Sequence, residues 1–212
     1  MQGTHIMLLV RTDPSAPKHR GISVLLVPLD SPGIDRRPLR QITGESEFAE
    51  IFFTDVRVPR SALLGPMHDG WAVTMATLGY ERTGVISMAA KLQRDVEVLV
   101  AGLRVEDPLL RDELVQRWID ARLTGILGAR ALAKLGADGR PGPEQSMIKS
   151  AWSRTTAELG ETLMRVQADA ALLSGNPAVH RFLQTRSATI AAGTTEVMKN
   201  LLAERVLGLP KG

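Results

Sequence analysis

Two short segments of this 212-residue chain carry groups that could do chemistry. The first is Gly79–Arg82, in which Glu81 lies three residues after Leu78 on an expected helix. Glu81 therefore falls close to the apolar stripe of that helix. Burial beside apolar side chains raises a carboxyl pKa toward neutrality, where a carboxylate abstracts protons most effectively. Glu81 is a candidate base; the alternative is a boundary carboxylate that pairs with Arg82 or with a neighbouring helix.

The second segment, Ile190–Glu196, interrupts the helical pattern with small residues and then opens a closing helix. Thr194 is the candidate N-cap of that helix. Because the first N–H groups of a helix lack intrahelical partners, such a start suits a negative or carbonyl oxygen. The alternative is an ordinary joint between two helices.

Other kinds of site find little support in the sequence. The chain has no cysteine, which excludes disulfides, thiolate zinc sites and cysteine nucleophiles. Neither a dinucleotide or phosphate loop nor a zinc-protease or serine-hydrolase motif is present. Four histidines are widely scattered, so no metal site is expected; they are His5, His19, His68 and His180.

Charge and hydropathy exclude further classes. Lys and Arg number 26 against 23 Asp and Glu, a balance that is not typical of nucleic-acid binding. No apolar run approaches the ~20 residues of a membrane-spanning helix. The run Ile6–Val10 is short and has no preceding basic region, which indicates a strand and not a signal peptide. A soluble cytoplasmic protein without membrane insertion is expected.

The elements that must position these segments fall into two regions. Residues 1–65 are predicted to form antiparallel β structure, with prolines between the strands and not within them. The expected strands are Ile6–Val10, Ile22–Val27 and Ala49–Thr54. The second of these is apolar on both sides, which indicates cover on both faces.

Residues 66–212 are predicted to form an antiparallel helical bundle, because the helices are long and their connections short. Asp107-Pro108, Gly142-Pro143 and Asn176-Pro177 mark helix starts, since proline suits the first helical position. The expected helices cover 70–103, 108–136, 143–174, 177–190 and 195–207. The fold class is therefore α+β.

Several stretches together resemble the acyl-CoA dehydrogenase family. Ala192–Asn200 and Ala203–Pro210 resemble its closing pattern Gly-Thr-Ser/Thr-Glu-Ile/Val-x-Arg/Lys-Asn followed by Ala-x-Arg-x-Leu-Gly. Gly70-Trp71 is similar to the start of the family's first bundle helix. The segments Arg11–Pro14, Lys18–Ser23, Ser31–Ile34 and Phe52–Pro59 resemble the middle β domain. The resemblance extends over nearly the whole chain from Leu8.

This resemblance implies a flavoprotein that uses FAD to oxidise an acyl-CoA thioester to the trans-2-enoyl-CoA. A glutamate removes the α-proton, a hydride passes to the flavin, and an electron-transfer flavoprotein takes the electrons. The family's subunits have an N-terminal helical domain, a middle β domain and a C-terminal bundle, assembled as dimers or tetramers. By this resemblance the chain holds a partial middle β domain, 1–65, and the C-terminal bundle, 66–212.

The resemblance also implies roles for individual residues. In one set of members the base directly precedes the closing Gly-Thr, but Ala192 stands there and cannot take a proton. In another set the base belongs to a Glu-Arg pair on the first bundle helix, which Glu81-Arg82 matches. The implied substrate-binding residues are Tyr80, Arg82 and Ala192. The implied FAD-binding residues are Gly193, Thr194, Thr195 and Glu196.

Two family segments have no counterpart: the Arg-x-x-Phe-Gly segment near 103–110 and the His-Gly-Gly segment, replaced by Leu173–Ala178. Three interpretations stay open. The chain is the C-terminal half of an active acyl-CoA dehydrogenase, a non-catalytic truncated subunit or oligomerisation module of such an assembly, or an unrelated structural α+β protein. With part of a β domain exposed, the isolated chain is expected to form homo- or hetero-oligomers or to be poorly soluble.

Overall fold

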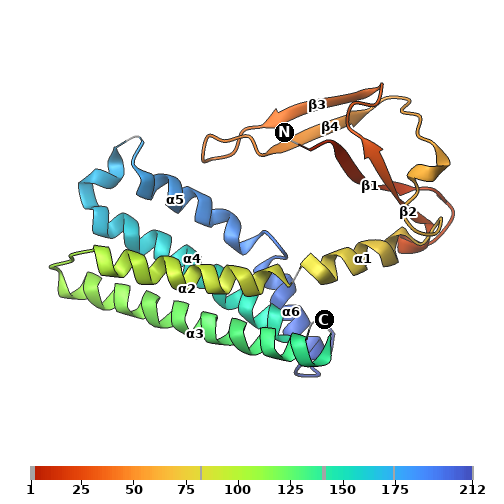
Figure 1. Cartoon of the computed structure of the whole chain (residues 1–212). Coiled ribbons are helices and arrows are strands. Elements are labelled where there is room, and N and C mark those ends of the chain that lie inside the picture. Colours follow the sequence, from red (N-terminus) through yellow and green to blue (C-terminus); the bar gives the residue numbers. More distant parts are fainter. Residues whose placement is uncertain (1–2, 82, 140–141, 174, 212) are drawn as a thin grey trace. The chain divides into compact units, whose positions relative to one another are not determined.

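A computed structural model describes residues 3–81, 83–139, 142–173 and 175–211. Contacts divide the chain into two compact units, Met1–Gly79 and Tyr80–Gly212. The first holds small antiparallel sheets and the second a helical bundle (Figure 1), so the predicted α+β class is confirmed. The domain boundary predicted between residues 65 and 66 stays a prediction. The division between the two units, after Gly79, lies within the helix Gly70–Glu81 and does not test that boundary.

The first unit contains two separate two-stranded antiparallel sheets. One pairs β1 (His5–Arg11) with β2 (Ile22–Pro28), and the other pairs β3 (Ile34–Leu39) with β4 (Phe48–Phe53). The predicted strands correspond to β1, β2 and β4.

Strand β3 was not predicted from the sequence, and it corrects the expectation that prolines avoid the strands. Pro38 lies within β3 opposite Ala49. Proline is tolerated there because β4 is the only strand paired with β3 in the described part of the chain. The charged run Asp35–Arg37 also hides the alternation by which a strand is recognised.

Strand β2 is the centre of the first unit. Val24 and Val27 are fully buried, whereas Leu26 is exposed, so the cover expected on both faces is incomplete within this chain. Helix α1 (Gly70–Glu81) starts against this strand. A Cβ at position 70 would lie 2.5 Å from the Ser23 carbonyl carbon, so only glycine allows this approach.

The next residue of α1 fixes the helix further. The Trp71 ring stacks on the His19 ring with 4.0 Å between centroids. The Gly70-Trp71 pair therefore docks the start of α1 onto the sheet, and the remaining turns of α1 lead to Glu81.

The single helix predicted over 70–103 is wrong, because the chain breaks it into α1 and α2 (Gly84–Gly102). The Thr83 N–H and hydroxyl donate to the Tyr80 carbonyl at 3.0 and 2.6 Å, which closes the last turn of α1. Glycines at 79 and 84 favour the break, since each costs about 1 kcal/mol relative to alanine in a helix. The apolar stripe continues across the break and hides it from pattern analysis.

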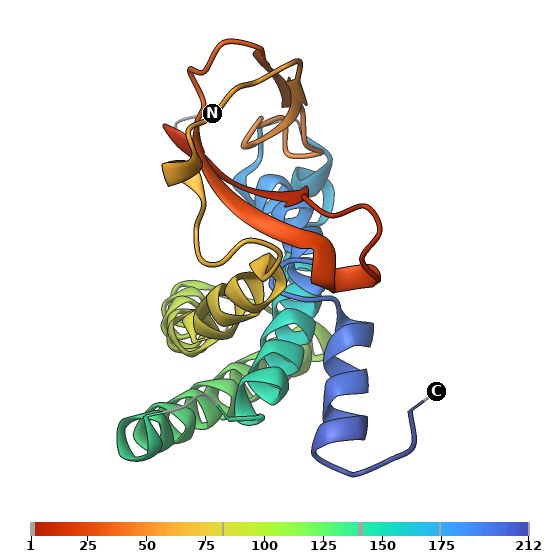
Figure 2. The ribbon, with the colours of Figure 1, turned by 90° about the vertical axis from the view of Figure 1, so that its right-hand side faces the viewer.

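The second unit is built around helix α4 (Glu144–Gln167). Besides α2, it contains α3 (Pro108–Asp138), α5 (Pro177–Thr185) and α6 (Thr195–Arg205). Helix α4 contacts α2, α3, α5 and α6, and Figure 2 shows α6 running beside it.

Two expected helices end earlier than predicted and continue as 3₁₀ turns. After α4, Ala168 adopts a φ of +45°, which ends the α-helix before the turn η3 (Ala168–Leu172). After α5 the chain tightens into η4 (Arg186–Thr189). Tight turns of this kind are frequent at helix ends.

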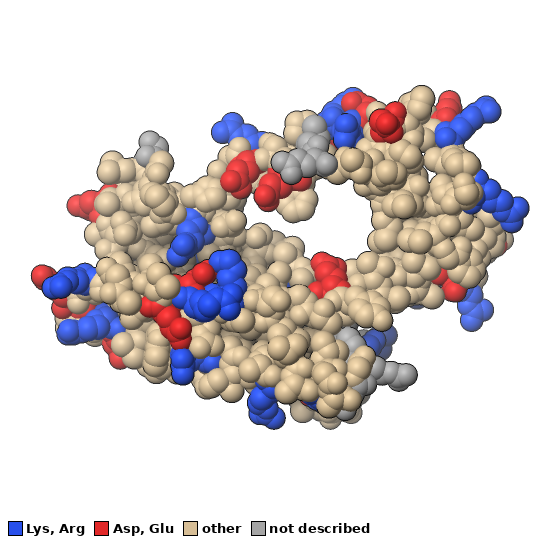
Figure 3. Space-filling model, in the orientation of Figure 1, with Lys and Arg blue, Asp and Glu red and all other residues tan. Residues whose placement is uncertain are grey.

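Apolar side chains of α2, α3 and α4 form two clusters in the bundle. One comprises Val85, Ile86, Ala89, Ala131 and Ile148, and the other Leu92, Val96, Ala121, Leu159 and Leu163. None of the helices in the described ranges combines the length and the hydropathy that a membrane-spanning segment requires. Acidic and basic side chains are interspersed on the face shown in Figure 3.

The proline-marked helix starts are confirmed at α3 and α5, where side chains cap the helices. Asp107 accepts hydrogen bonds from the N–H groups of Leu109 and Leu110, and Asn176 accepts one from Ala178 at 2.8 Å. Helix α4 begins one residue after Pro143, without a side-chain cap.

We expect Asp107→Ala to lower the free energy of unfolding by about 1 kcal/mol, because it leaves the first N–H groups of α3 without their acceptor. Urea unfolding followed by circular dichroism measures this loss. Asp112→Ala, at an exposed carboxylate of the same helix, is the control and should cost less than about 0.5 kcal/mol. Equal losses in both variants would contradict the capping role.

Candidate active site

The closing segment forms a sharp turn that leads into α6. Ala192 has a φ of +55° and Gly193 a φ of +101°, so two successive residues lie in the left-handed region. The Thr194 hydroxyl then accepts a hydrogen bond from the Val197 N–H at 3.2 Å. The predicted N-cap is therefore confirmed. An alanine held at positive φ stores strain of about 1–3 kcal/mol, which occurs most often at functional positions.

Glu196 lies in the first turn of α6 and is exposed. Its own backbone N–H and the Thr194 hydroxyl hydrogen-bond the carboxylate and hold the pKa of Glu196 below its usual value. The carboxylate is thus ionised at neutral pH, beside the positive end of the helix dipole. An ionised carboxylate in this place can accept hydrogen bonds from ligand hydroxyl or N–H groups.

Glu81 is the last residue of α1, and its side chain is exposed. Tyr80 is also exposed, and so is Leu78, the member of the stripe nearest to Glu81 on α1. The described residues therefore do not supply the apolar burial that the sequence pattern predicted around Glu81. Arg82 lies outside the described residues.

The candidate site residues form two groups in this structure. Residues 192–196 are gathered at the start of α6, and Tyr80 and Glu81 stand at the end of α1. Among the described residues, no hydrogen bond or ion pair joins the two groups. The same residues include no cluster of histidine and carboxylate groups placed to hold a metal ion.

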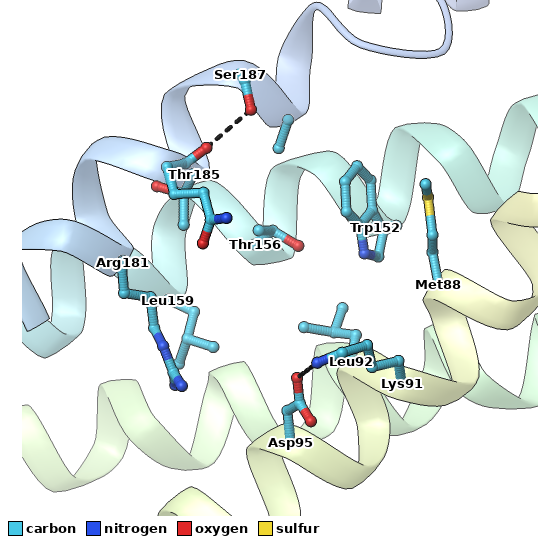
Figure 4. A pocket seen from close by; sticks show the side chains of 13 residues that line it. Met88, Lys91, Leu92, Asp95, Trp152, Thr156, Leu159, Arg181, Thr185 and Ser187 are labelled. Atoms are coloured by element: carbon cyan, nitrogen blue, oxygen red, sulfur yellow. Dashed lines mark hydrogen bonds and ion pairs between the residues drawn. The ribbon is translucent and has the colours of Figure 1, made fainter. Parts of the chain in front are cut away.

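A pocket of about 410 Å³ opens in the bundle between α2, α4, α5 and η4. Figure 4 shows Met88, Leu92 and Trp152 around it, with the ion pair of Lys91 and Asp95 at its edge. None of the predicted site residues lines this pocket. Sequence reasoning missed the pocket because its residues come from separate helices, where periodicity assigns them to a core.

The helical bundle, with its closing left-handed turn and threonine-capped helix, belongs to a known class of protein. Residues 68–207 match the family model described as "Acyl-CoA dehydrogenase, C-terminal domain". The chain belongs to the acyl-CoA dehydrogenase family.

Individual relatives agree with this assignment. The chain is 38% identical over 214 residues to "Acyl-CoA dehydrogenase IpdE1" of Mycolicibacterium smegmatis. This alignment covers 96% of the chain and 53% of the relative. The chain therefore spans about half the length of this curated relative.

Solved structures show the same fold. The structure described as "Tcur3481-Tcur3483 steroid ACAD" is 26% identical, with a TM-score of 0.90, over 100% of this chain and 58% of that one. The ChsE4-ChsE5 complex from Mycobacterium tuberculosis is 25% identical, with a TM-score of 0.82, over 99% of this chain and 58% of that one.

We expect Gly193→Ala to destabilise the protein by about 1–3 kcal/mol, because an L-residue is strained at this φ. Its Cβ would also lie 2.6 Å from the Met198 Cε atom. Thermal unfolding measures the effect. Gly136→Ala, inside α3 with no atom within 4 Å of the added Cβ, is the control and should not destabilise. A Gly193→Ala variant as stable as this control would contradict the strained turn.

Proposed function

We propose that this chain contributes its β unit and bundle to an FAD-dependent acyl-CoA dehydrogenase that converts an acyl-CoA thioester to the trans-2-enoyl-CoA. The observation that carries the proposal is the family match over residues 68–207, which contains both the Glu81-Arg82 pair and the closing segment. Because the chain spans about half of the relative IpdE1, the working form is a longer polypeptide or a partnered assembly.

The residues of the closing segment fit a flavin dinucleotide. The start of α6 offers N–H groups at the positive end of a helix, next to the hydroxyls of Thr194 and Thr195. The ionised Glu196 adds an acceptor for hydroxyl groups. Gly193, Thr194, Thr195 and Glu196 are therefore the proposed FAD-binding residues. When bound, FAD supplies the acceptor for the hydride that leaves the substrate β-carbon.

Glu81 is the proposed base of the reaction. Its carboxylate takes the proton from the α-carbon, the electrons of that C–H bond form the new C=C bond, and the hydride leaves from the β-carbon. The family places its catalytic glutamate at one of two positions, which correspond to Ala192 and Glu81 in this chain. Ala192 has no side-chain group that can accept a proton, so Glu81 is the proposed base. The exposed end of α1 is open to substrate, and a bound acyl chain would supply the desolvation that raises the base's pKa.

Backbone groups complete the proposed chemistry. The Ala192 N–H, set in its left-handed turn, is proposed to donate to the thioester oxygen and stabilise the enolate-like charge that develops there. Tyr80 and Arg82 are proposed to contact the substrate beside Glu81.

The relatives favour a particular substrate and assembly. The solved relative of TM-score 0.90 is described as a steroid ACAD, which favours a steroid-derived acyl-CoA as substrate. The ChsE4-ChsE5 structure is a complex of two proteins, which favours hetero-oligomeric assembly. An electron-transfer flavoprotein is the proposed electron acceptor, and the cytoplasm the proposed location.

A second function is favoured by the exposure of Glu81. In a heteromeric assembly, this chain could serve as a non-catalytic subunit or oligomerisation module while the partner supplies the base. The two functions differ in whether chemistry depends on the Glu81 carboxylate.

We expect Glu81→Gln to slow exchange of the substrate α-proton with D₂O by about 10²–10⁴-fold, the usual contribution of a general base. The protein should be purified through a tag added at its own chromosomal locus, so that it retains any partner or further segment. Mass spectrometry of the acyl-CoA measures the exchange, and visible absorbance of the purified protein reports bound flavin.

Glu106→Gln is the matched control, since Glu106 is an exposed carboxylate between α2 and α3. It should leave exchange unchanged. Undiminished exchange in a folded, flavin-loaded Glu81→Gln protein would refute the base assignment and favour the non-catalytic subunit.

A further inference from the structure

Lys149 is a buried cationic residue with no part in the chemistry described above. Its side chain, near the start of α4, is 1% exposed and is the largest fully buried side chain among the described residues. The Nζ atom donates a hydrogen bond to the Ala188 carbonyl at 2.9 Å and lies 5.7 Å from the centroid of the Trp152 ring. Burial lowers the pKa of Lys149.

The accepting carbonyl belongs to a helix end that needs a donor. Helix α5 and the turn η4 form one helical run from Pro177 to Thr189. The last carbonyls of a helix lack intrahelical N–H partners and carry partial negative charge. Lys149 therefore caps the end of this run with a buried side chain.

The carbonyl that Lys149 holds lies four residues before the strained Ala192. The carbonyl of Ser187, the residue before Ala188, accepts hydrogen bonds from the N–H groups of Ile190 and Ala191 at 3.0 and 2.9 Å. This bonded turn encloses Ala188 and leads directly into the closing segment. A displacement of Ala188 would therefore be passed on to Ala192.

A second cation secures the other side of η4 on α4. Arg186 donates to the Ala157 carbonyl at 2.9 Å and to the Glu161 carboxylate at 2.9 Å. Arg186 has a carboxylate partner near the surface, whereas the described hydrogen bond of Lys149 goes to a backbone carbonyl in the core. A buried ammonium is costly to place, and methionine of similar length would avoid that cost. A gain in stability is therefore a poor explanation of Lys149.

We propose that Lys149 is a positioning residue for the active site: by holding the Ala188 carbonyl, it fixes the left-handed turn at 192–193 and the start of α6. This inference rests on the proposed function, in which that turn binds the flavin and the thioester. It assigns to a core lysine a role that acts through the backbone and not through contact with substrate.

The first test follows backbone motion in Lys149→Met by amide hydrogen exchange. We expect the amides of residues 190–198 to exchange about tenfold faster, as loss of a hydrogen bond made by a charged group predicts, while the amides of α2 and α3 do not change. Lys91→Met, the same substitution at an exposed lysine of α2, should change neither region. Unchanged exchange at 190–198, or uniform acceleration throughout the bundle, would overturn the proposal.

A measurement on the unaltered protein keeps the proposal testable if Lys149→Met does not fold. The Ile190 and Ala191 amides should then exchange as slowly as those of α4, because the turn that contains them is anchored. Exchange at the rate of the chain ends would overturn the anchoring.

The second test uses the tagged protein with its flavin. Lys149→Met should weaken FAD binding about tenfold and alter the visible circular dichroism of the flavin, whereas Lys91→Met should do neither. An unchanged dissociation constant and spectrum in a flavin-loaded Lys149→Met protein would overturn the positioning role alone. A wild-type protein without flavin would instead overturn the proposed function on which that role rests.

Discussion

The packing of every other bundle helix on α4 is the constraint on which this structure depends. A helix surrounded by others normally presents a continuous apolar surface, yet the buried positions of α4 are largely polar: Gln145, Ser146, Lys149, Ser153, Thr155 and Thr162. Several of these side chains are small, which lets neighbouring backbones approach closely. At Gly160 an added Cβ would lie 2.8 Å from the Thr185 hydroxyl, so α5 rests almost directly on the α4 backbone. Ser153 donates within the helix, to the Lys149 carbonyl at 2.7 Å, and Thr162 donates to the Glu113 carboxylate of α3 at 3.5 Å. The buried Thr155 hydroxyl has no hydrogen-bond partner among the described residues.

The two candidate functional segments depend on different supports. The closing segment depends on α4, through η4 and through α6, both of which contact that helix. Glu81 depends on α1, which docks on β2 by the close approach of Gly70 and the stacking of Trp71 on His19. The break closed by Thr83 then makes Glu81 the end of a helix and not the middle of one. At this end position the Glu81 side chain is exposed and lacks the apolar surroundings that the sequence pattern predicted.

Both candidate segments lie within residues 68–207, which match the acyl-CoA dehydrogenase family. The chain carries the bundle and part of the β structure over about half the length of its relative IpdE1. Leu26 of β2 and the end of α1 are exposed among the described residues. The described residues leave Glu81 exposed, whereas the strained turn at Ala192 is already formed within this chain.

Local signals in the sequence determined the α+β class, most of the elements, the caps at Asp107, Asn176 and Thr194, and the family. Such features depend on neighbouring residues, which a sequence shows directly. Strand β3 and the break after Glu81 escaped prediction, because a charged edge strand and a continuous apolar stripe resemble other structures. Only the tertiary structure decided that Glu81 is exposed, that a pocket opens between α2, α4 and α5, and that Lys149 holds Ala188. The last contact joins residues 39 positions apart, and the packing of α4 and not the order of residues brings them together.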